Sequence, residues 1–137
     1  MDRKLNCVLM VDDSEPTNYV NKKIVEKTGI ADRVVTVESG FEALEFLKEE
    51  SDKEGYPELI FLDINMPGMN GWEFLEAYDK LPKGEQALMV VVMLTTSLNP
   101  DDRTKAVRLG YVGDFINKPL TKDKVLEIHE AFFKHRR

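Results

Sequence analysis

Five short runs of apolar residues recur along the chain, separated by polar segments. The runs are continuous rather than alternating, so they predict strands that are buried on both faces, as in a parallel sheet. In order they are Leu5 to Val11, Val34 to Val37, Leu59 to Leu62, Leu88 to Leu94 and a weaker run from Tyr111 to Ile116. We therefore expect a sheet of five parallel strands.

The segments between these runs have the pattern of helices. Ser39 with Glu42, and Asn70 with Glu73, have the spacing of a capping box, and Asn99 to Asp102 supplies a cap, a proline and two acids for a third start. Apolar stripes at helical spacing predict two buried faces, one with Phe74, Leu75, Tyr78 and Leu81 and one with Val125, Ile128 and Phe132. Strands that alternate with five helices predict an open α/β fold with helices on both faces of the sheet.

Size and composition narrow the class of protein. A chain of 137 residues is the length of one domain, so we expect a single domain over residues 1-137. The net charge of -6 argues against direct binding to nucleic acid or to anionic membranes, and no apolar segment is long enough to span a bilayer. We expect a cytoplasmic protein. Cys7, the single cysteine, is expected to be a buried apolar residue, and His129 and His135 are expected to lie on the surface of the last helix.

Polar residues follow the predicted strands at the ends where ligands of open α/β sheets bind. They are Asp12 and Asp13, then Asp63, then Thr95 to Ser97, and finally Asn117 to Pro119. Taken singly, such residues are most often helix caps, turn formers or solvated loop residues. Together they bring three carboxylates, a hydroxyl and an ammonium into one region. Clustered carboxylates raise one another's pKa, and a hard cation such as Mg²⁺ relieves that cost, so the pattern indicates a metal site.

The segments VDDS, LDINMPGMNG, MLTTS and FINKPL, in this order, resemble the receiver domain of two-component response regulators over nearly the whole chain. The resemblance implies a flavodoxin-like, doubly wound sheet with strand order 2-1-3-4-5. The chain is similar to the stand-alone type of receiver, such as the single-domain chemotaxis regulators, in which no output domain is expected after the receiver.

The resemblance also implies a phosphorelay chemistry. Asp63 would be the phosphoacceptor, taking a phosphoryl group from a phosphohistidine in a Mg²⁺-dependent reaction. Asp12, Asp13, Asp63 and the backbone carbonyl of Asn65 would be the protein ligands of Mg²⁺. Lys118 would pair with Asp63 before phosphorylation and with a phosphoryl oxygen afterwards.

A switch follows from the same resemblance. The Thr95 hydroxyl would move to the phosphoryl group, and Phe115 would turn inward behind it, reshaping the surface of the fourth helix, fifth strand and fifth helix. Asn65 and Ser97 occupy positions that tune the lifetime of the aspartyl phosphate. The bond between Lys118 and Pro119 would be a cis peptide that aims the lysine.

The implied partners are a sensor histidine kinase or a histidine phosphotransfer protein, and a downstream target that binds the switched surface. The chain would be a monomer or a homodimer formed on phosphorylation. It would catalyse its own phosphorylation and dephosphorylation without being a turnover enzyme.

Three other functions compete with this one. A phosphatase of the haloacid dehalogenase type would carry a second acid two residues after Asp63, where this chain has Asn65. A flavin-binding module would carry a phosphate cradle after the first strand, but Asp12 and Asp13 would repel a phosphate there. The third alternative is a receiver that works as an interaction module without phosphorylation, and an Asp63→Asn variant with unchanged biological output would identify it.

Overall fold

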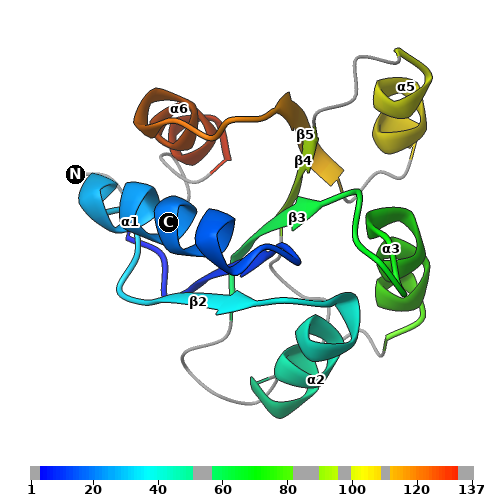
Figure 1. Ribbon diagram of the computed structural model, residues 1–137. Helices are drawn as coiled ribbons and strands as arrows, with labels where there is room; N and C mark the ends of the chain where they lie inside the picture. The colour runs from blue at the N-terminus through cyan, green and yellow to red at the C-terminus, as the bar shows by residue number, and fades with distance from the viewer. Residues whose placement is uncertain (1–3, 51–56, 82–89, 96–99, 109–111, 133–137) are drawn as a thin grey trace.

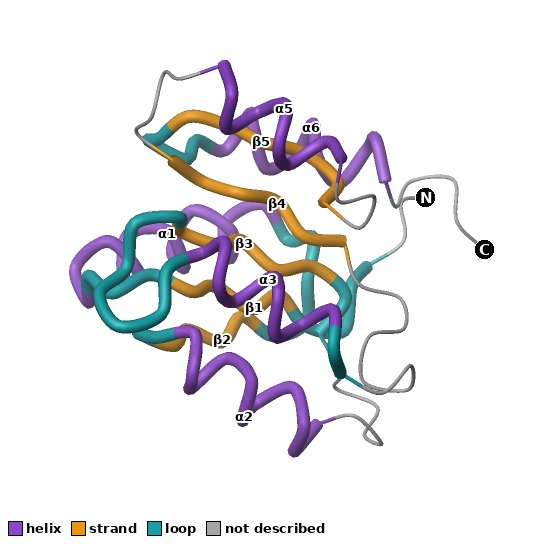
Figure 2. Tube along the Cα trace, turned by 90° about the vertical axis from the view of Figure 1, so that its right-hand side faces the viewer, coloured by secondary structure: helices purple, strands orange, loops and turns teal. Residues whose placement is uncertain are grey.

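The computed structural model describes residues 4–50, 57–81, 90–95, 100–108 and 112–132. Within them, five parallel strands form one sheet in the order β2-β1-β3-β4-β5, as Figure 2 shows from the side. The strands are β1 (Val8–Val11), β2 (Val34–Val37), β3 (Leu59–Asp63), β4 (Val90–Thr95) and β5 (Val112–Asn117). The predicted fold class and strand order are confirmed.

Helices cover both faces of this sheet (Figure 1). The described helices are α1 (Glu15–Thr28), α2 (Gly40–Glu50), α3 (Gly71–Asp79), α5 (Pro100–Arg108) and α6 (Lys122–Phe132). On one face α1 and α6 cover an apolar cluster that includes Val25, Val125 and Ile128, and on the other α2, α3 and α5 cover a cluster that includes Leu47, Phe74 and Ala106. Because helices cover both faces, the inner strands β1 and β3 are buried throughout and read as continuous apolar runs, whereas the edge strand β2 is only partly buried.

Local sequence explains where these helices begin. Asn70 and Glu73 form the complete capping box predicted for α3, in which each side chain accepts from the other residue's backbone N–H. At α2 the Ser39 hydroxyl accepts from the Glu42 N–H at 3.1 Å, but the Glu42 carboxylate accepts from the Glu38 N–H at 2.9 Å and not from Ser39. Only half of the second predicted box is therefore present. The cap predicted at Asn99 lies outside the described residues.

The first strand is shorter than predicted. Leu5 makes only an isolated bridge with Ala31, and the continuous ladders begin at Val8, which pairs with Val34 on one side and Leu59 on the other. The apolar run extends further than the ladder because Leu5 and Cys7 are themselves fully buried. The first two residues of the run predicted at Leu88 lie outside the described residues.

The predicted apolar stripes are confirmed, and one histidine is not where it was expected. Phe74, Leu75, Tyr78, Val125 and Ile128 are buried, while Leu81 and Phe132 pack against the core as partly buried residues. The prediction that His129 lies on the surface was wrong, since only 5% of it is exposed. It follows Val125 by four residues and so shares the buried face of α6. Among the described helices, none combines the length and apolarity that a bilayer span needs.

Candidate functional site

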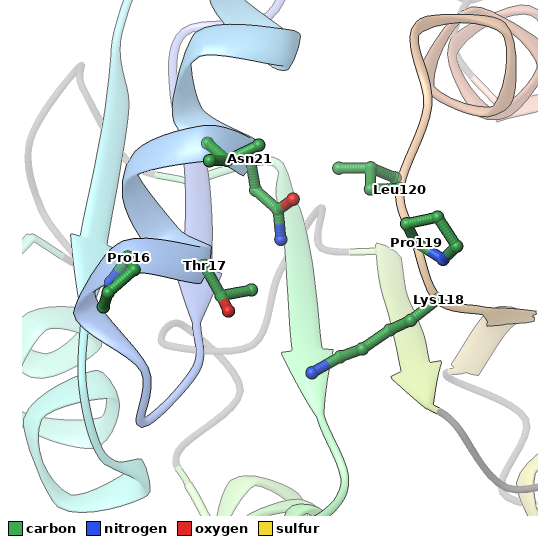
Figure 3. A pocket seen from close by; sticks show the side chains of 7 residues that line it. Pro16, Thr17, Asn21, Lys118, Pro119 and Leu120 are labelled. Carbon is green, nitrogen blue, oxygen red and sulfur yellow. The ribbon is translucent and has the colours of Figure 1, made fainter.

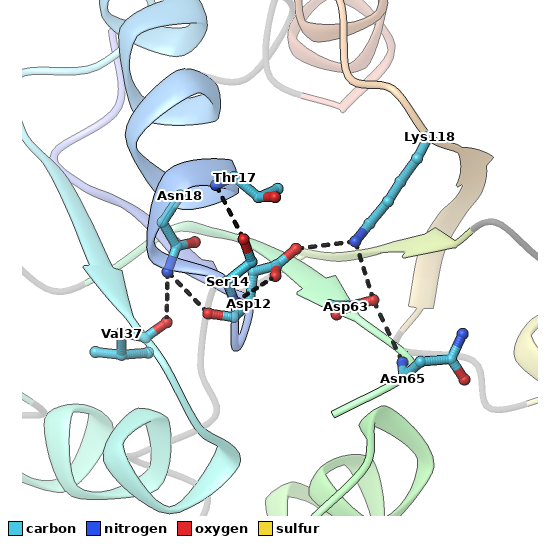
Figure 4. Close-up of polar contacts among 8 residues, drawn as sticks. All are labelled: Asp12, Ser14, Thr17, Asn18, Val37, Asp63, Asn65 and Lys118. Atoms are coloured by element: carbon cyan, nitrogen blue, oxygen red, sulfur yellow. Dashed lines mark hydrogen bonds and ion pairs between the residues drawn. The ribbon is translucent and has the colours of Figure 1, made fainter. Parts of the chain in front are cut away.

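Asp12 lies directly after β1, where the chain turns into α1, and only 4% of it is exposed. Its Oδ1 accepts from the Ser14 N–H at 2.9 Å, which closes a tight turn. The Asn18 side-chain amide, one turn into α1, donates to the carbonyl of Asp12 at 2.9 Å and to that of Val37 at 3.0 Å (Figure 4). These bonds tie the end of β1 to the end of β2 and fix where the Asp12 carboxylate points.

Asp63 is the last residue of β3, and 4% of it is exposed. Its Oδ1 accepts from the Asn65 N–H at 3.3 Å. The loop after it returns close to the strand, because the Gly71 N–H donates to the Ile64 carbonyl at 2.8 Å. A Cβ at Gly71 would lie 2.8 Å from the Ile64 Cα and 2.9 Å from the Asp63 carbonyl oxygen. Glycine therefore allows the start of α3 to pack directly against the backbone of Asp63.

Lys118 follows β5 and reaches the two buried acids, which lie at the ends of β1 and β3 on the far side of β4. Its backbone N–H donates to the Thr95 carbonyl at 2.7 Å, which links the ends of β4 and β5, and its bond to Pro119 is cis. Its Nζ lies 2.9 Å from the Asp12 Oδ2 and 3.3 Å from the Asp63 Oδ1 (Figure 4). One ammonium thus bridges both carboxylates.

The three predicted acids do come together. One carboxylate oxygen from each of Asp12, Asp13 and Asp63 lies within 4.8 Å of the others. Asp12 and Asp63 are buried while Asp13 is exposed, so the cluster opens to solvent on the Asp13 side.

Burial and neighbouring charges shift the pKa of two groups in this cluster, Asp63 and Lys118. Burial raises the pKa of Asp63, the neighbouring Asp12 charge adds to this, and the Lys118 ammonium opposes it. Burial alone would lower the pKa of Lys118, but its hydrogen bond to Asp12 and the Asp63 charge outweigh that effect, so its pKa is raised. The ammonium stays charged, and the Asp63 carboxylate is more basic than an exposed one.

The donor set of this cluster fits a hard divalent cation. All the candidate ligand atoms are oxygens, two of the carboxylates are held by backbone N–H groups, and the third faces solvent. Mg²⁺ favours a few carboxylates together with several waters.

The two residues predicted to form the switch lie on β4, next to β3 in the sheet, and on β5 beyond it. Thr95 is fully buried at the end of β4, and Phe115, in β5, is 4% exposed and already turned inward. Arg103 of α5 donates to the Phe115 carbonyl at 2.7 Å and lies 5.5 Å from the centre of its ring. Asn65 is exposed, and Ser97 lies outside the described residues.

A cavity of about 370 Å³ adjoins the cluster between α1 and the loop after β5 (Figure 3). Lys118 forms one wall of the cavity. The other residues that line the cavity are Pro16, Thr17, Val20, Asn21, Pro119 and Leu120. A group that approaches Asp63 along this side would pass Lys118 and the first turn of α1.

Sequence reasoning assigned no role to three residues that shape the site. Asn18 and Gly71 hold the backbones of Asp12 and Asp63, and Lys124 of α6 donates to the carbonyls on both sides of Lys118. A signal for Asn18 is present, because Asn18, Asn21 and Val25 share one buried face of α1. A buried amide needs partners, and the Asn18 NH₂ group finds them at the ends of β1 and β2, whereas the Asn18 Oδ1 has no hydrogen-bond partner among the described residues.

Comparison with known proteins agrees with this geometry. Residues 8–130 match the family model of the response regulator receiver domain. The chain is 33% identical over 120 residues to the chemotaxis protein CheY of Bacillus subtilis, covering 88% of this chain and 91% of that protein. It is 30% identical to the response regulator Rcp1 of Synechocystis, covering 88% and 78% of the two chains.

A solved structure supports the same assignment. The crystal structure of a two-component response regulator from Cytophaga hutchinsonii superposes with a TM-score of 0.87 at 32% identity, covering 95% of this chain and 98% of that one. Family model, sequence and structure therefore agree over most of the described residues. The chain belongs to the response regulator receiver domains of two-component signalling.

Proposed function

We propose that this chain is a response regulator receiver that accepts a phosphoryl group on Asp63 from a phosphohistidine. The observation that carries the proposal is the position of Asp63, a buried acid 3.3 Å from the Lys118 ammonium and within 4.8 Å of the Asp12 and Asp13 carboxylates. Phosphoryl transfer depends mainly on positioning and on neutralising charge, and this arrangement supports both.

The Asp63 carboxylate is the nucleophile. One of its oxygens attacks phosphorus, the bond between phosphorus and the imidazole nitrogen breaks, and the imidazole leaves with that electron pair and takes up a proton. The raised pKa of Asp63 favours this role, because a more basic carboxylate is a stronger nucleophile while it remains ionised. Lys118 holds the ionised form and then meets the negative charge of the transferred group.

Asp12, Asp13, Asp63 and the Asn65 backbone carbonyl would hold a Mg²⁺ ion. Its contribution would be to neutralise negative charge on the phosphoryl oxygens. The chain's own part is to fix these ligands, through the Ser14 N–H at Asp12 and the Asn65 N–H at Asp63.

The output is a switch in a protein-binding surface. Asp63 pairs with Leu94 at the end of β4, and Thr95 is the next residue of that strand, so its hydroxyl would move toward a phosphoryl group on Asp63. Phe115 lies in the neighbouring strand and couples this movement to α5, β5 and α6. Asn65 and Ser97 set how long the aspartyl phosphate survives.

The partners that follow are a sensor histidine kinase or histidine phosphotransfer protein as donor, and a target protein that binds the α5, β5 and α6 surface. The chain accepts one phosphoryl group per signalling cycle and is not a turnover enzyme.

The first test is the intact mass of the protein after incubation with acetyl phosphate, with and without Mg²⁺. The expected result is a Mg²⁺-dependent gain of one phosphoryl group in the native chain and no gain in Asp63→Asn. A folded native chain that gains no mass would exclude the mechanism, and the interaction module that needs no phosphorylation would replace it.

A further inference from the structure

Lys124, in the first turn of α6, holds the backbone around Lys118. Its Nζ donates to the Asn117 carbonyl at 2.9 Å and to the Pro119 carbonyl at 3.0 Å. These two carbonyls belong to the residues immediately before and after Lys118. A single ammonium thus bridges the chain on both sides of the lysine that contacts Asp12 and Asp63.

A lysine at this position is unfavourable for the helix itself. The first turn of a helix carries partial positive charge, which favours acids and disfavours cations. Lys124 is the third residue of α6, and its own backbone N–H donates to the Thr121 hydroxyl at 3.2 Å. Hydrogen bonds from a charged donor are stronger than neutral ones, so the two carbonyl contacts compensate for the unfavourable position.

Together with β4, Lys124 fixes the Lys118 backbone at three points. The Lys118 N–H is bonded to Thr95, and the carbonyls on either side of it are bonded to Lys124. A lysine side chain is long and has many rotamers, so the position of its ammonium depends on how firmly its Cα is held. The Lys118 Nζ must meet two carboxylates from different strands, at 2.9 Å and 3.3 Å.

We propose that Lys124 is a positioning residue for phosphoryl transfer, which acts by clamping the two carbonyls that flank Lys118. It touches neither Asp63 nor the phosphoryl group, and its effect passes entirely through Lys118. This inference rests on the proposed function. Removing a residue that orients a metal ligand typically costs about 10- to 100-fold in activity, and we expect an effect at the lower end of that range for a residue that orients Lys118.

The test compares phosphorylation rates with acetyl phosphate over a range of donor concentrations, followed by intact mass. Lys124→Met keeps the length of the side chain and removes its donors, so its maximal rate should fall about tenfold. Lys124→Arg keeps a cationic donor and should recover most of that rate. Lys122→Met is the matched control, because Lys122 is an exposed lysine in the same helical turn, and it should behave like the native chain.

A double variant separates positioning from a general loss of structure. If Lys124 acts through Lys118, the combination of Lys118→Ala with Lys124→Met should be no slower than Lys118→Ala alone. A readout that needs no phosphorylation is the hydrogen exchange of the Lys118 amide, which should speed up in Lys124→Met because two of its neighbouring restraints are lost.

Three results would each overturn the inference and leave the proposed function standing. The first is a Lys124→Met phosphorylation rate within twofold of the native rate. The others are rate losses that multiply in the double variant and an unchanged hydrogen-exchange rate at the Lys118 amide. A native chain that gains no phosphoryl group at all overturns the proposed function, and this inference falls with it.

Discussion

Asp63 is the residue at which folding and function oppose each other. The proposed reaction needs an ionised carboxylate, yet Asp63 is buried beside the Asp12 charge, and its pKa is raised above the ordinary value of 3.8. The folded chain therefore binds this proton more tightly than the unfolded chain. The resulting stabilisation is fully present below pH 3.8 and is lost as the pH rises through the raised pKa.

This predicts that Asp63→Asn stabilises the protein at neutral pH when no divalent cation is present. We expect its melting temperature to be higher by about 3 °C, the shift that roughly 1 kcal/mol makes in a chain of this size. The difference should shrink as the pH falls toward 3.8. Calorimetry across this pH range, with Asp13→Asn as an exposed control, checks it. A variant that melts below the native chain would contradict the electrostatic argument.

Two glycines at equivalent helix starts should respond differently to alanine. At Gly71 the new Cβ would meet backbone, 2.8 Å from the Ile64 Cα, while at Gly40 it would meet the Met69 Sδ at 2.6 Å. Backbone cannot move aside cheaply, but the end of a methionine side chain can. Gly71→Ala should therefore cost about 1–3 kcal/mol of unfolding free energy in urea, and Gly40→Ala less. Equal costs would show that the close approach at Gly71 does not matter.

Among the elements, α5 packs against β5, and one of its residues, Arg103, also contacts the predicted switch residue Phe115. Arg103 bonds the Phe115 carbonyl at 2.7 Å and lies over its ring, so this arginine holds both the strand and the aromatic side chain. The inward position of Phe115 is therefore stabilised before any phosphorylation.

Replacing Arg103 with methionine should loosen this attachment. We expect the free energy of unfolding to fall by about 1.5–3 kcal/mol, as for the loss of a hydrogen bond from a charged donor, and amide hydrogen exchange in β5 to become faster. Arg108→Met, at an exposed position of the same helix, is the control and should leave both unchanged. Exchange in β5 that is the same in both variants would contradict a role for Arg103.

How far the sequence predicts each element depends on the range of the interactions that define it. The Asn70 cap and the positions of the strands follow from neighbouring residues and were predicted correctly, apart from the early start of β1. Burial on both faces holds for the inner strands β1 and β3, whereas the edge strands β2 and β5 are partly exposed. The half-formed box at Ser39 depends on tertiary packing, which local spacing leaves open, but the burial of His129 could have been read from its four-residue spacing to Val125. For the site, the motif predicted which acids and which lysine meet. The supporting contacts of Asn18 and Lys124 involve backbone carbonyls, which side-chain motifs do not specify.

For the molecule as a whole, the acidic cluster joins the ends of β1 and β3, so a bound cation should stabilise the entire fold. A ligand that binds the folded chain and not the unfolded chain adds about 2.7 kcal/mol to the free energy of unfolding when its concentration is 100 times Kd. We expect Mg²⁺ to raise the melting temperature of the native chain and EDTA to reverse this. Asp12→Asn and Asp63→Asn should respond much less. A native chain whose melting temperature is independent of Mg²⁺ would exclude the proposed metal site.

The ion pair between Lys118 and Asp12 joins residues 106 positions apart in the sequence. During synthesis the acids therefore emerge long before the lysine that neutralises them. The acidic cluster and its lysine are therefore complete only when the ends of β1, β3 and β5 all stand in the sheet, and the lysine is the last of these groups to be synthesised.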